Sequence, residues 1–291
     1  MADEITIGRT RIIAIHDGEG PFFSPRDEAF PGSSAARWAT ADRLDPGAVT
    51  DDGRWWLRFR AFAVVEPDDT VTIVDAGIGP EGAPASWAPL PGMLPESLRN
   101  KGIDRDHVDR VIITHLHTDH VGWAVVDDAP FFPRAEYLLP RADADAVSEL
   151  NPMLRERLLD VLDAAGVLRL VDGDQVLSPR VAIRATPGHT PGHQSVIVRD
   201  GDGLLAITGD ALLGALQLLY PEQPYEHEED PALARESRTR LLDDVDTMDG
   251  LLATPHMSMP FIAVPKGAAS PSPSHSNSPA PTDSPTPPTH P

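Results

Sequence analysis

The sequence feature that most constrains the fold is the segment at residues 115–120, which reads His-Leu-His-Thr-Asp-His. Imidazole and carboxylate are ligands that Zn²⁺, Fe²⁺, Mn²⁺ and Co²⁺ accept, and the chain has no cysteine to offer a thiolate. His115 and His117 are two residues apart, so on an extended backbone they point the same way. Asp119 and His120 follow a turn and can face a second point. The segment therefore predicts a loop that holds two metal ions side by side, the alternative being a histidine-rich surface turn.

Short apolar runs precede this motif and three further polar residues. Residues 111–114 (Val-Ile-Ile-Thr) have the composition of a buried strand in an α/β protein. Open sheets place their ligand crevices at the C-terminal ends of such strands. Similar runs lead into three other candidates, which are His189, Asp210 and His256. Four strand ends that each deliver a histidine or an aspartate indicate one metal site assembled from distant parts of the chain.

These segments resemble the metallo-β-lactamase-fold hydrolase superfamily, over roughly residues 5–260. The resemblance is carried by HLHTDH at 115–120, TPGHTPGH at 186–193, GDA at 209–211 and PH at 255–256. It implies an α/β fold, the αββα four-layer sandwich, in which two mixed β-sheets lie face to face with helices outside.

The resemblance also implies which residues hold two divalent metal ions. In the family, two groups of three residues each hold one ion, and an aspartate bridges both. Carried over to this chain, the first group is His115, His117 and His189. The second group is Asp119, His120 and His256, and the bridging residue is Asp210. Zinc is the first expectation for both ions, with manganese, iron and cobalt as alternatives.

Such a pair of ions has a defined chemistry. Two ions about 3.5–4 Å apart share a water, lower its pKa and polarise a carbonyl or phosphoryl oxygen of the substrate. We therefore expect hydrolysis by a metal-bridging hydroxide. Asp119 would orient this hydroxide and carry a proton, which makes it the candidate catalytic residue as well as a ligand.

Other residues near the motifs are candidates for supporting roles. Asp75 follows a further strand-like run and is expected to accept a hydrogen bond from a ligand imidazole, with a simple turn cap as the alternative. His193 is expected to be a supporting polar group rather than a ligand. Trp123 fits a cavity lining and a core position equally well. We expect His16, His107 and His227 to lie at the surface or to have their hydrogen bonds satisfied away from the site.

Hydrolysis of a small-molecule ester, lactone or thioester is the activity that fits best. The motifs are closest to those of quorum-sensing lactonases, organophosphate hydrolases and the thioesterase/cyclase enzymes of polyketide pathways. The expected partner is therefore a small-molecule substrate, with a carrier-bound acyl thioester included. Asp210 speaks against the cysteine-free β-lactamases, which lack this carboxylate. The family's lactonases usually place a tyrosine shortly after it, whereas Ala211-Leu212-Leu213 follows here. The alternative is a mononuclear iron-dependent dioxygenase of the persulfide type, or a metal-binding protein without hydrolytic turnover.

Composition limits the partners and the location. The formal net charge is −21, and the only lysines are Lys101 and Lys266. A nucleic-acid partner is not expected, because binding to phosphates needs clustered lysine and arginine. No apolar run is long enough to span a membrane, and no secretory signal is visible. The absence of cysteine favours a cytoplasmic protein. The oligomeric state stays open.

The chain is expected to form one catalytic domain over residues 1–265. Two helices are predicted between the motifs, one from Asn151-Pro152 to Gly166 and one that begins at Asp230-Pro231 and carries its apolar face to Leu252. Residues 266–291 consist largely of proline, serine and threonine and are expected to be a disordered tail.

Removal of residues 267–291 is expected to leave turnover and the thermal midpoint nearly unchanged, because this segment has few apolar groups to bury. Calorimetry and kinetics on the truncated and the full chain measure both quantities. A large loss of thermal stability in the truncated chain would show that the tail packs on the domain.

Overall fold

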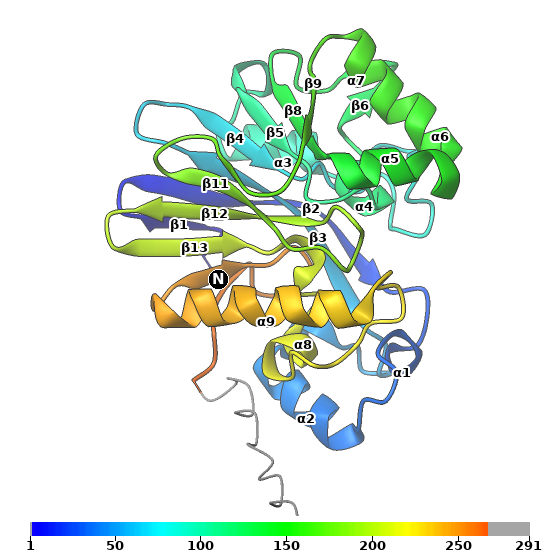
Figure 1. Cartoon of the computed structure of the whole chain (residues 1–291). Coiled ribbons are helices and arrows are strands. Elements are labelled where there is room, and N and C mark those ends of the chain that lie inside the picture. The colour runs from blue at the N-terminus through cyan, green and yellow to red at the C-terminus, as the bar shows by residue number, and fades with distance from the viewer. Residues whose placement is uncertain (1, 267–291) are drawn as a thin grey trace, which may run out of the picture.

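Two mixed sheets lie face to face and form the centre of the molecule (Figure 1). The computed structural model describes residues 2–266, so most of the tail predicted at 266–291 lies outside the described residues. The seven-stranded sheet has the order β1-β2-β3-β4-β5-β8-β9. Its strands are β1 (Glu4–Ile7), β2 (Thr10–Pro21), β3 (Trp56–Val65), β4 (Val71–Val74), β5 (Arg110–Ile112), β8 (Glu136–Pro140) and β9 (Leu168–Val171).

The second sheet is built mostly from the later part of the chain. It has six strands in the order β10-β11-β12-β13-β14-β15. They are β10 (Gln175–Val176), β11 (Val181–Ala185), β12 (Gln194–Asp200), β13 (Gly203–Ile207), β14 (Leu251–Ala253) and β15 (Phe261–Ala263). A small hairpin is formed by β6 (Val125–Val126) and β7 (Ala129–Pro130). Each large sheet contains both parallel and antiparallel pairs, since β4 and β5 run parallel, as do β13 and β14.

Helices cover the outer faces of both sheets (Figure 1). The seven-stranded sheet is covered by α3 (Leu94–Asn100), α5 (Arg141–Leu150), α6 (Pro152–Leu154) and α7 (Asp160–Ala164). The six-stranded sheet is covered by α8 (Ala215–Leu219) and α9 (Pro231–Thr247), with α2 (Ala35–Leu44) beside them. The short helices α1 (Arg26–Ala29) and α4 (Thr118–Val121) lie in connecting segments.

Alternation along the strands produces three apolar layers. Val196 and Val198 of β12 pack between the two sheets, whereas Ile197 between them packs toward α9. β13 repeats this pattern, since Leu205 faces the other sheet and Leu204 faces α9. Side chains on a strand point alternately to opposite faces, so a strand that is apolar at every position is buried on both. The expected αββα sandwich is thereby confirmed.

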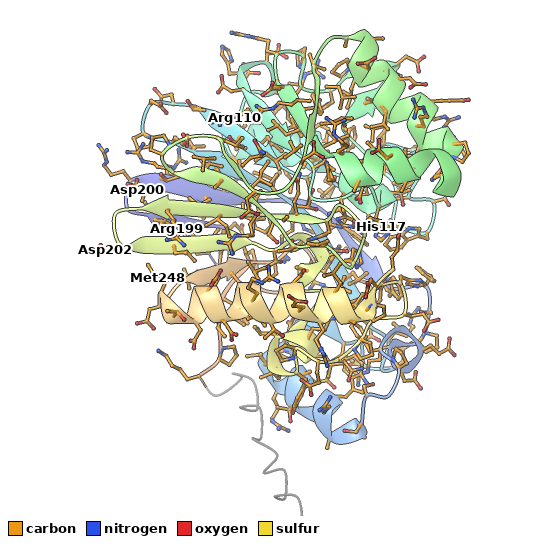
Figure 2. All side chains as sticks on the ribbon, in the orientation of Figure 1. Arg110, His117, Arg199, Asp200, Asp202 and Met248 are labelled. Carbon is orange, nitrogen blue, oxygen red and sulfur yellow. The ribbon has the colours of Figure 1, made fainter. Side chains whose placement is uncertain are left out.

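The apolar runs that precede the candidate ligands are strands, as predicted. Val111 and Ile112 lie in β5, which ends before Ile113 and Thr114, and the later runs form β11, β13 and β14. Their C-terminal ends meet at one end of the sandwich, where His117 lies, whereas Asp200 and Asp202 of the β12–β13 turn lie at the other end (Figure 2). The topology therefore brings the candidate site residues together.

Both predicted helices are present, but the second is shorter than expected. The first runs through α6, a π-helical turn (Arg155–Leu159) and α7, and the Asn151 side chain accepts a hydrogen bond from the Leu154 N–H at its start. α9 ends at Thr247, and Leu252 belongs to β14, so the predicted continuation to Leu252 is wrong. Asp249 adopts φ +49°, which turns the chain before the strand. No helix in the described range 2–266 is long and apolar enough to cross a membrane.

A buried carboxylate, Asp17, fastens three segments behind the site. It accepts hydrogen bonds from the backbone N–H groups of Ile78 and Leu94, both at 2.6 Å, and from the Trp123 indole at 3.0 Å. Burial raises its pKa, while these donors act in the opposite direction. A carboxylate suits this position because it can accept from several donors at once.

Replacement Asp17→Asn is expected to lower the free energy of unfolding by about 2 kcal/mol or more, because the amide replaces one acceptor oxygen with a donor beside buried N–H groups. Denaturant unfolding measures this loss. Asp202→Asn, at the exposed turn between β12 and β13, is the matched control and should change the free energy by less than about 0.5 kcal/mol. Equal effects of the two substitutions would contradict the role given to Asp17.

Candidate metal centre

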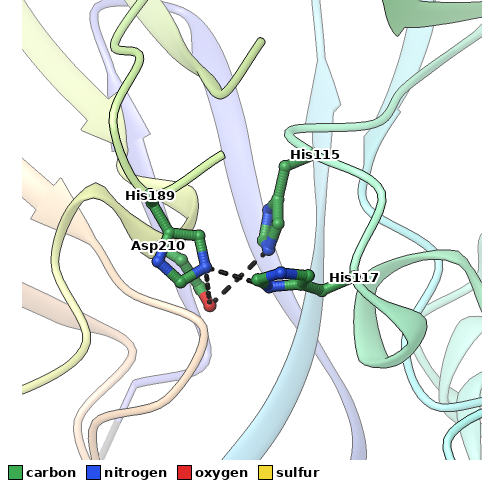
Figure 3. A group of neighbouring side chains, drawn as sticks. All are labelled: His115, His117, His189 and Asp210. Carbon is green, nitrogen blue, oxygen red and sulfur yellow. Dashed lines mark hydrogen bonds and ion pairs between the residues drawn. The ribbon is translucent and has the colours of Figure 1, made fainter. Parts of the chain in front are cut away.

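The seven predicted ligands lie together in two neighbouring groups. The first group is His115, His117, His189 and Asp210, which Figure 3 shows converging on one point. The second group is Asp119, His120 and His256. Within each group the ligand atoms lie within 4.8 Å of one another. The structure thus brings together every residue that the sequence predicted for the site.

Asp210 stands between the two groups and directs one carboxylate oxygen to each. Its Oδ2 lies 3.3 Å from His189 Nε2 and 3.7 Å from His115 Nε2. Its Oδ1 lies 3.2 Å from His120 Nε2 and 3.1 Å from His256 Nε2. This division of the two oxygens is the arrangement expected of a carboxylate that bridges two cations.

Groups behind the imidazoles fix which ring nitrogen faces the centre. His120 Nδ1 lies 2.9 Å from Asp75 Oδ2, and His256 Nδ1 lies 2.8 Å from the Arg58 carbonyl oxygen. A carboxylate or a carbonyl oxygen only accepts, so each Nδ1 donates and Nε2 is the ring nitrogen that remains to face the centre. The Thr114 hydroxyl donates to Asp75 Oδ2 at 3.0 Å, so it accepts from His115 Nδ1, which also lies 3.0 Å away.

The inner faces of these side chains fit cations. His115 Nε2 is buried and has no hydrogen-bond partner among the described residues. Ring nitrogens also face each other, with His189 Nε2 3.0 Å from His117 Nδ1 and His256 Nε2 3.4 Å from His120 Nε2. Two neutral imidazole nitrogens that both present lone pairs repel each other unless a cation or a proton lies between them. A donor set of nitrogen and carboxylate oxygen fits zinc and similar divalent ions.

The pKa shifts of the site residues also fit the binding of cations. Burial lowers the pKa of His115 and of His117 well below the ordinary value, so both rings are neutral and can act as ligands. Burial also acts to lower the pKa of His120, but Asp210, Asp119 and Asp75 raise it well above the ordinary value. Burial acts to raise the pKa of Asp210, but His120 and His256 hold it well below its usual range. The carboxylates thus favour positive charge in this half of the site.

Asp75 and His193 have the supporting roles that were predicted for them. Asp75, at the end of β4, binds His120 and also accepts from the Thr114 N–H at 2.7 Å. It adopts φ +62°, a conformation that aspartate tolerates better than most residues. His193 Nε2 accepts the backbone N–H of Asp210 at 2.9 Å, so it positions the proposed bridge without facing the centre.

A further buried carboxylate, Asp143 of α5, joins the two loops that carry His117 and His189. It accepts from the Leu116 N–H at 3.2 Å, and from the Thr190 hydroxyl at 2.8 Å and the Gly192 N–H at 2.6 Å. The first contact lies beside His117 and the other two lie just after His189. Asp143 was not predicted, because nothing in its local sequence marks it.

A cavity of about 410 Å³ opens over the centre. Its floor includes His117, Asp119, His189, Asp210 and His256. One wall is aromatic and is formed by Phe22, Phe23, Trp55, Trp87, Tyr225 and His227. The opposite wall is aliphatic and is formed by Leu116, Ala146, Val147 and Leu154. The centre is therefore reached through a largely apolar pocket of the size of a small organic molecule.

The sequence did not reveal that Tyr225 and His227 line the cavity. Tyr225 is 6% exposed and stacks against His189 with ring centroids 6.0 Å apart. His227, predicted at the surface, is exposed but lines the aromatic wall. Trp123, for which cavity and core fitted equally well, packs in the core behind the site. The sequence separation of Tyr225 from Asp210 does not predict that Tyr225 lies at the site. An irregular loop, and not a strand or a helix, returns the chain to the cavity at Tyr225.

Family comparison identifies the larger group to which the chain belongs. The family model of the metallo-beta-lactamase superfamily matches residues 57–251. This range contains all the predicted ligands except His256. An N-acyl homoserine lactonase from Bacillus cereus is 31% identical over 137 residues, which are 45% of this chain and 51% of the relative. One from a Bacillus species is 28% identical over 184 residues, 58% of this chain and 67% of the relative. The chain thus spans about half to two thirds of these relatives.

Solved structures share the fold. AidC, described as a dizinc quorum-quenching lactonase, superposes with a TM-score of 0.72 at 19% identity, over 90% of this chain and 96% of its own. A probable metal-dependent hydrolase from Staphylococcus aureus gives a TM-score of 0.77 at 15% identity, over 91% and 95%. The hydrolase AbOPH gives 0.71 at 21% identity, over 90% and 96%. The family match over residues 57–251 and these shared folds agree, and the chain belongs to the metallo-beta-lactamase superfamily.

Proposed function

We propose that this protein is a metal-dependent hydrolase with two divalent ions, which cleaves an uncharged small-molecule lactone or ester in a catalytic domain formed by residues 1–265. The observation that carries the proposal is the position of Asp210 between two groups of ligands at the floor of an apolar cavity. The similarity to enzymes named as N-acyl homoserine lactonases supports the lactone as a substrate class.

The second group of ligands favours two ions over one. A mononuclear iron site would need only part of this set. Asp119, His120 and His256 nevertheless converge beside the first group, and Asp75 and the Arg58 carbonyl fix the His120 and His256 rings. Zinc is the proposed metal, because it accepts imidazole and carboxylate in flexible geometry and needs no redox partner.

The charge of the cavity favours a neutral substrate over a carrier-bound thioester. Among the described residues that line it, none is lysine or arginine. Asp143 and Glu229 are both part of the lining, and burial together with Asp143 raises the pKa of Glu229. The phosphate of a carrier's pantetheine arm or of coenzyme A would find no lysine or arginine on the cavity walls, and the carboxylates there disfavour its binding.

Once bound, the two ions would lower the pKa of a shared water and polarise the scissile carbonyl. Asp119 lies on the cavity floor with Oδ2 3.6 Å from His120 Nε2 and 3.7 Å from His256 Nε2. It can take the proton of the attacking water and pass it to the oxygen that leaves when the acyl C–O bond breaks. Burial, with Asp210 and Asp119, raises the pKa of Tyr225, so its phenol stays protonated and can donate to a substrate oxygen.

The proposed activity is tested with protein purified without added metal. Elemental analysis should find two divalent ions per chain, and a panel of lactones, aryl esters, acyl-coenzyme A thioesters and phosphotriesters should show the highest kcat/KM for neutral lactones or esters. One iron per chain with no hydrolysis of any panel member would support the dioxygenase alternative instead.

Replacement His117→Ala is expected to empty one metal site and abolish most turnover while the protein stays folded, because the ligand lies on a loop and not within a packed layer. His107→Ala is the matched control, since His107 is exposed and pairs with Asp104 outside the centre. Metal content and circular dichroism of both variants check the prediction. Retention of two metals and full turnover by His117→Ala would refute the ligand assignment.

Asp210→Asn and Asp119→Asn are each expected to lower kcat on the order of 10²-fold or more, the scale of acid–base and electrostatic groups. They should differ in metal content. Asp210→Asn removes the charge that both ions would share, so occupancy should fall at both sites, whereas Asp119→Asn should affect chiefly the second. An Asp210→Asn protein with two tightly held ions and near-normal kcat would contradict the bridging role.

A further inference from the structure

One wall of the cavity is an irregular segment, residues 221–229, which joins α8 to α9. Alternate residues of this segment, Tyr225, His227 and Glu229, line the cavity. The residue between the last two, Glu228, is buried on the other side. The segment has no helical or sheet hydrogen bonding that would fix its course, so its position must come from other contacts.

The strongest of these contacts is a fully buried ion pair between Glu228 and Arg238 of α9. The exposed fraction of each side chain is 1%. Both terminal nitrogens of Arg238 donate to Glu228 Oε1, at 3.0 and 2.6 Å, and Gln217 of α8 donates to the same oxygen at 3.1 Å. The other carboxylate oxygen, Oε2, accepts the backbone N–H of Tyr225 at 3.1 Å. The pair thus joins both flanking helices to the wall residue that stacks on His189.

The residues that follow Glu228 are tied to the metal loop itself. The Glu229 N–H donates to the His189 carbonyl at 3.2 Å, and the Asp230 N–H donates to the Gly188 carbonyl at 2.9 Å. Side chains on this segment therefore have a defined distance from the centre. The ion pair and the metal loop therefore both hold the C-terminal part of the segment, and Glu228 also reaches back to the Tyr225 N–H.

A buried ion pair is not needed to stabilise this position. Transfer of two charges out of water is costly, and apolar residues of similar size often stabilise a protein equally well. Apolar residues could not fix the orientation of the segment in this way, because only the carboxylate can accept hydrogen bonds from Arg238, Gln217 and the Tyr225 N–H at once. The geometry is therefore better explained by placement of the wall than by stability of the core.

We propose that Glu228 and Arg238 are positioning residues that fix the 221–229 wall and thereby set which acyl group the cavity accepts. The proposal rests on the function proposed above, since it concerns the substrate of the same site. The acyl group would lie between this wall and the aliphatic side chains of Val147 and Leu154. A longer apolar acyl group reaches further along the wall and depends on it more than a short one.

The test compares the double variant Glu228→Leu/Arg238→Met with the wild type. Both charges are removed together, so no unpaired charge is left in the core. We expect unchanged metal content and kcat, and a KM for a long-chain acyl lactone or ester raised about 10-fold, with the short-chain KM nearly unchanged. Hydrogen exchange of the amides in 221–229 should become faster.

Two further variants complete the design. Glu236→Leu/Arg240→Met removes an exposed ion pair from the same helix and should leave KM and exchange as in the wild type. Arg238→Lys keeps the charge but loses the forked donor, so its long-chain KM should lie between those of the wild type and the double variant. If the double variant does not fold, Arg238→Lys alone carries the test.

The proposal is overturned if long- and short-chain KM values stay as in the wild type, or if both change in the same proportion with loss of metal. A wild type that hydrolyses no lactone or ester at all would refute the proposed function. In that case the exchange of residues 221–229 still tests the positioning role, and unchanged exchange in the double variant would refute it.

Discussion

The Asp210 carboxylate, buried among imidazoles, is the interaction on which the rest of the site depends. A buried negative charge is unstable unless positive charge compensates it at close range. Here each oxygen faces histidine nitrogens of a different group. His193 holds the backbone N–H of Asp210, and Asp75 holds His120 from behind. Much of the polar structure at this end of the sandwich therefore serves to hold one carboxylate where two cations would meet.

A second principle of construction is the use of buried carboxylates as connectors between loops. Asp17 joins the segments at Ile78, Leu94 and Trp123, and Asp143 joins the loops beside His117 and His189. Loops lack the repeated hydrogen bonds of helices and sheets, so their N–H groups need other acceptors when they are buried. An acceptor with two oxygens can satisfy several of them and fix their separation. The two carboxylates thereby fix the spacing of segments that carry or support the proposed ligands.

The sequence predicted those parts of the molecule in which local pattern and spatial position coincide. The strands before His115, His189, Asp210 and His256 were visible as apolar runs, and strand ends must meet at one edge of a sheet. Asp75 was found for the same reason. Asp143, Tyr225 and the Glu228–Arg238 pair were not found, because their contacts depend on how loops fold back in space. Arg238 also lies in a strongly charged stretch of α9, where local sequence suggests a solvent-exposed side chain. The end of α9 was misplaced because the apolar spacing of the helix continues into Leu252 of β14.

The proposed ligands follow strands of both sheets, whereas most of the cavity walls come from connecting segments and from the edges of helices. The residues proposed to hold the ions and those proposed to select the substrate therefore lie largely on different segments, although Leu116 of the wall stands between His115 and His117. Mutations in segments such as 221–229 can alter what enters without disturbing the residues that would hold the ions.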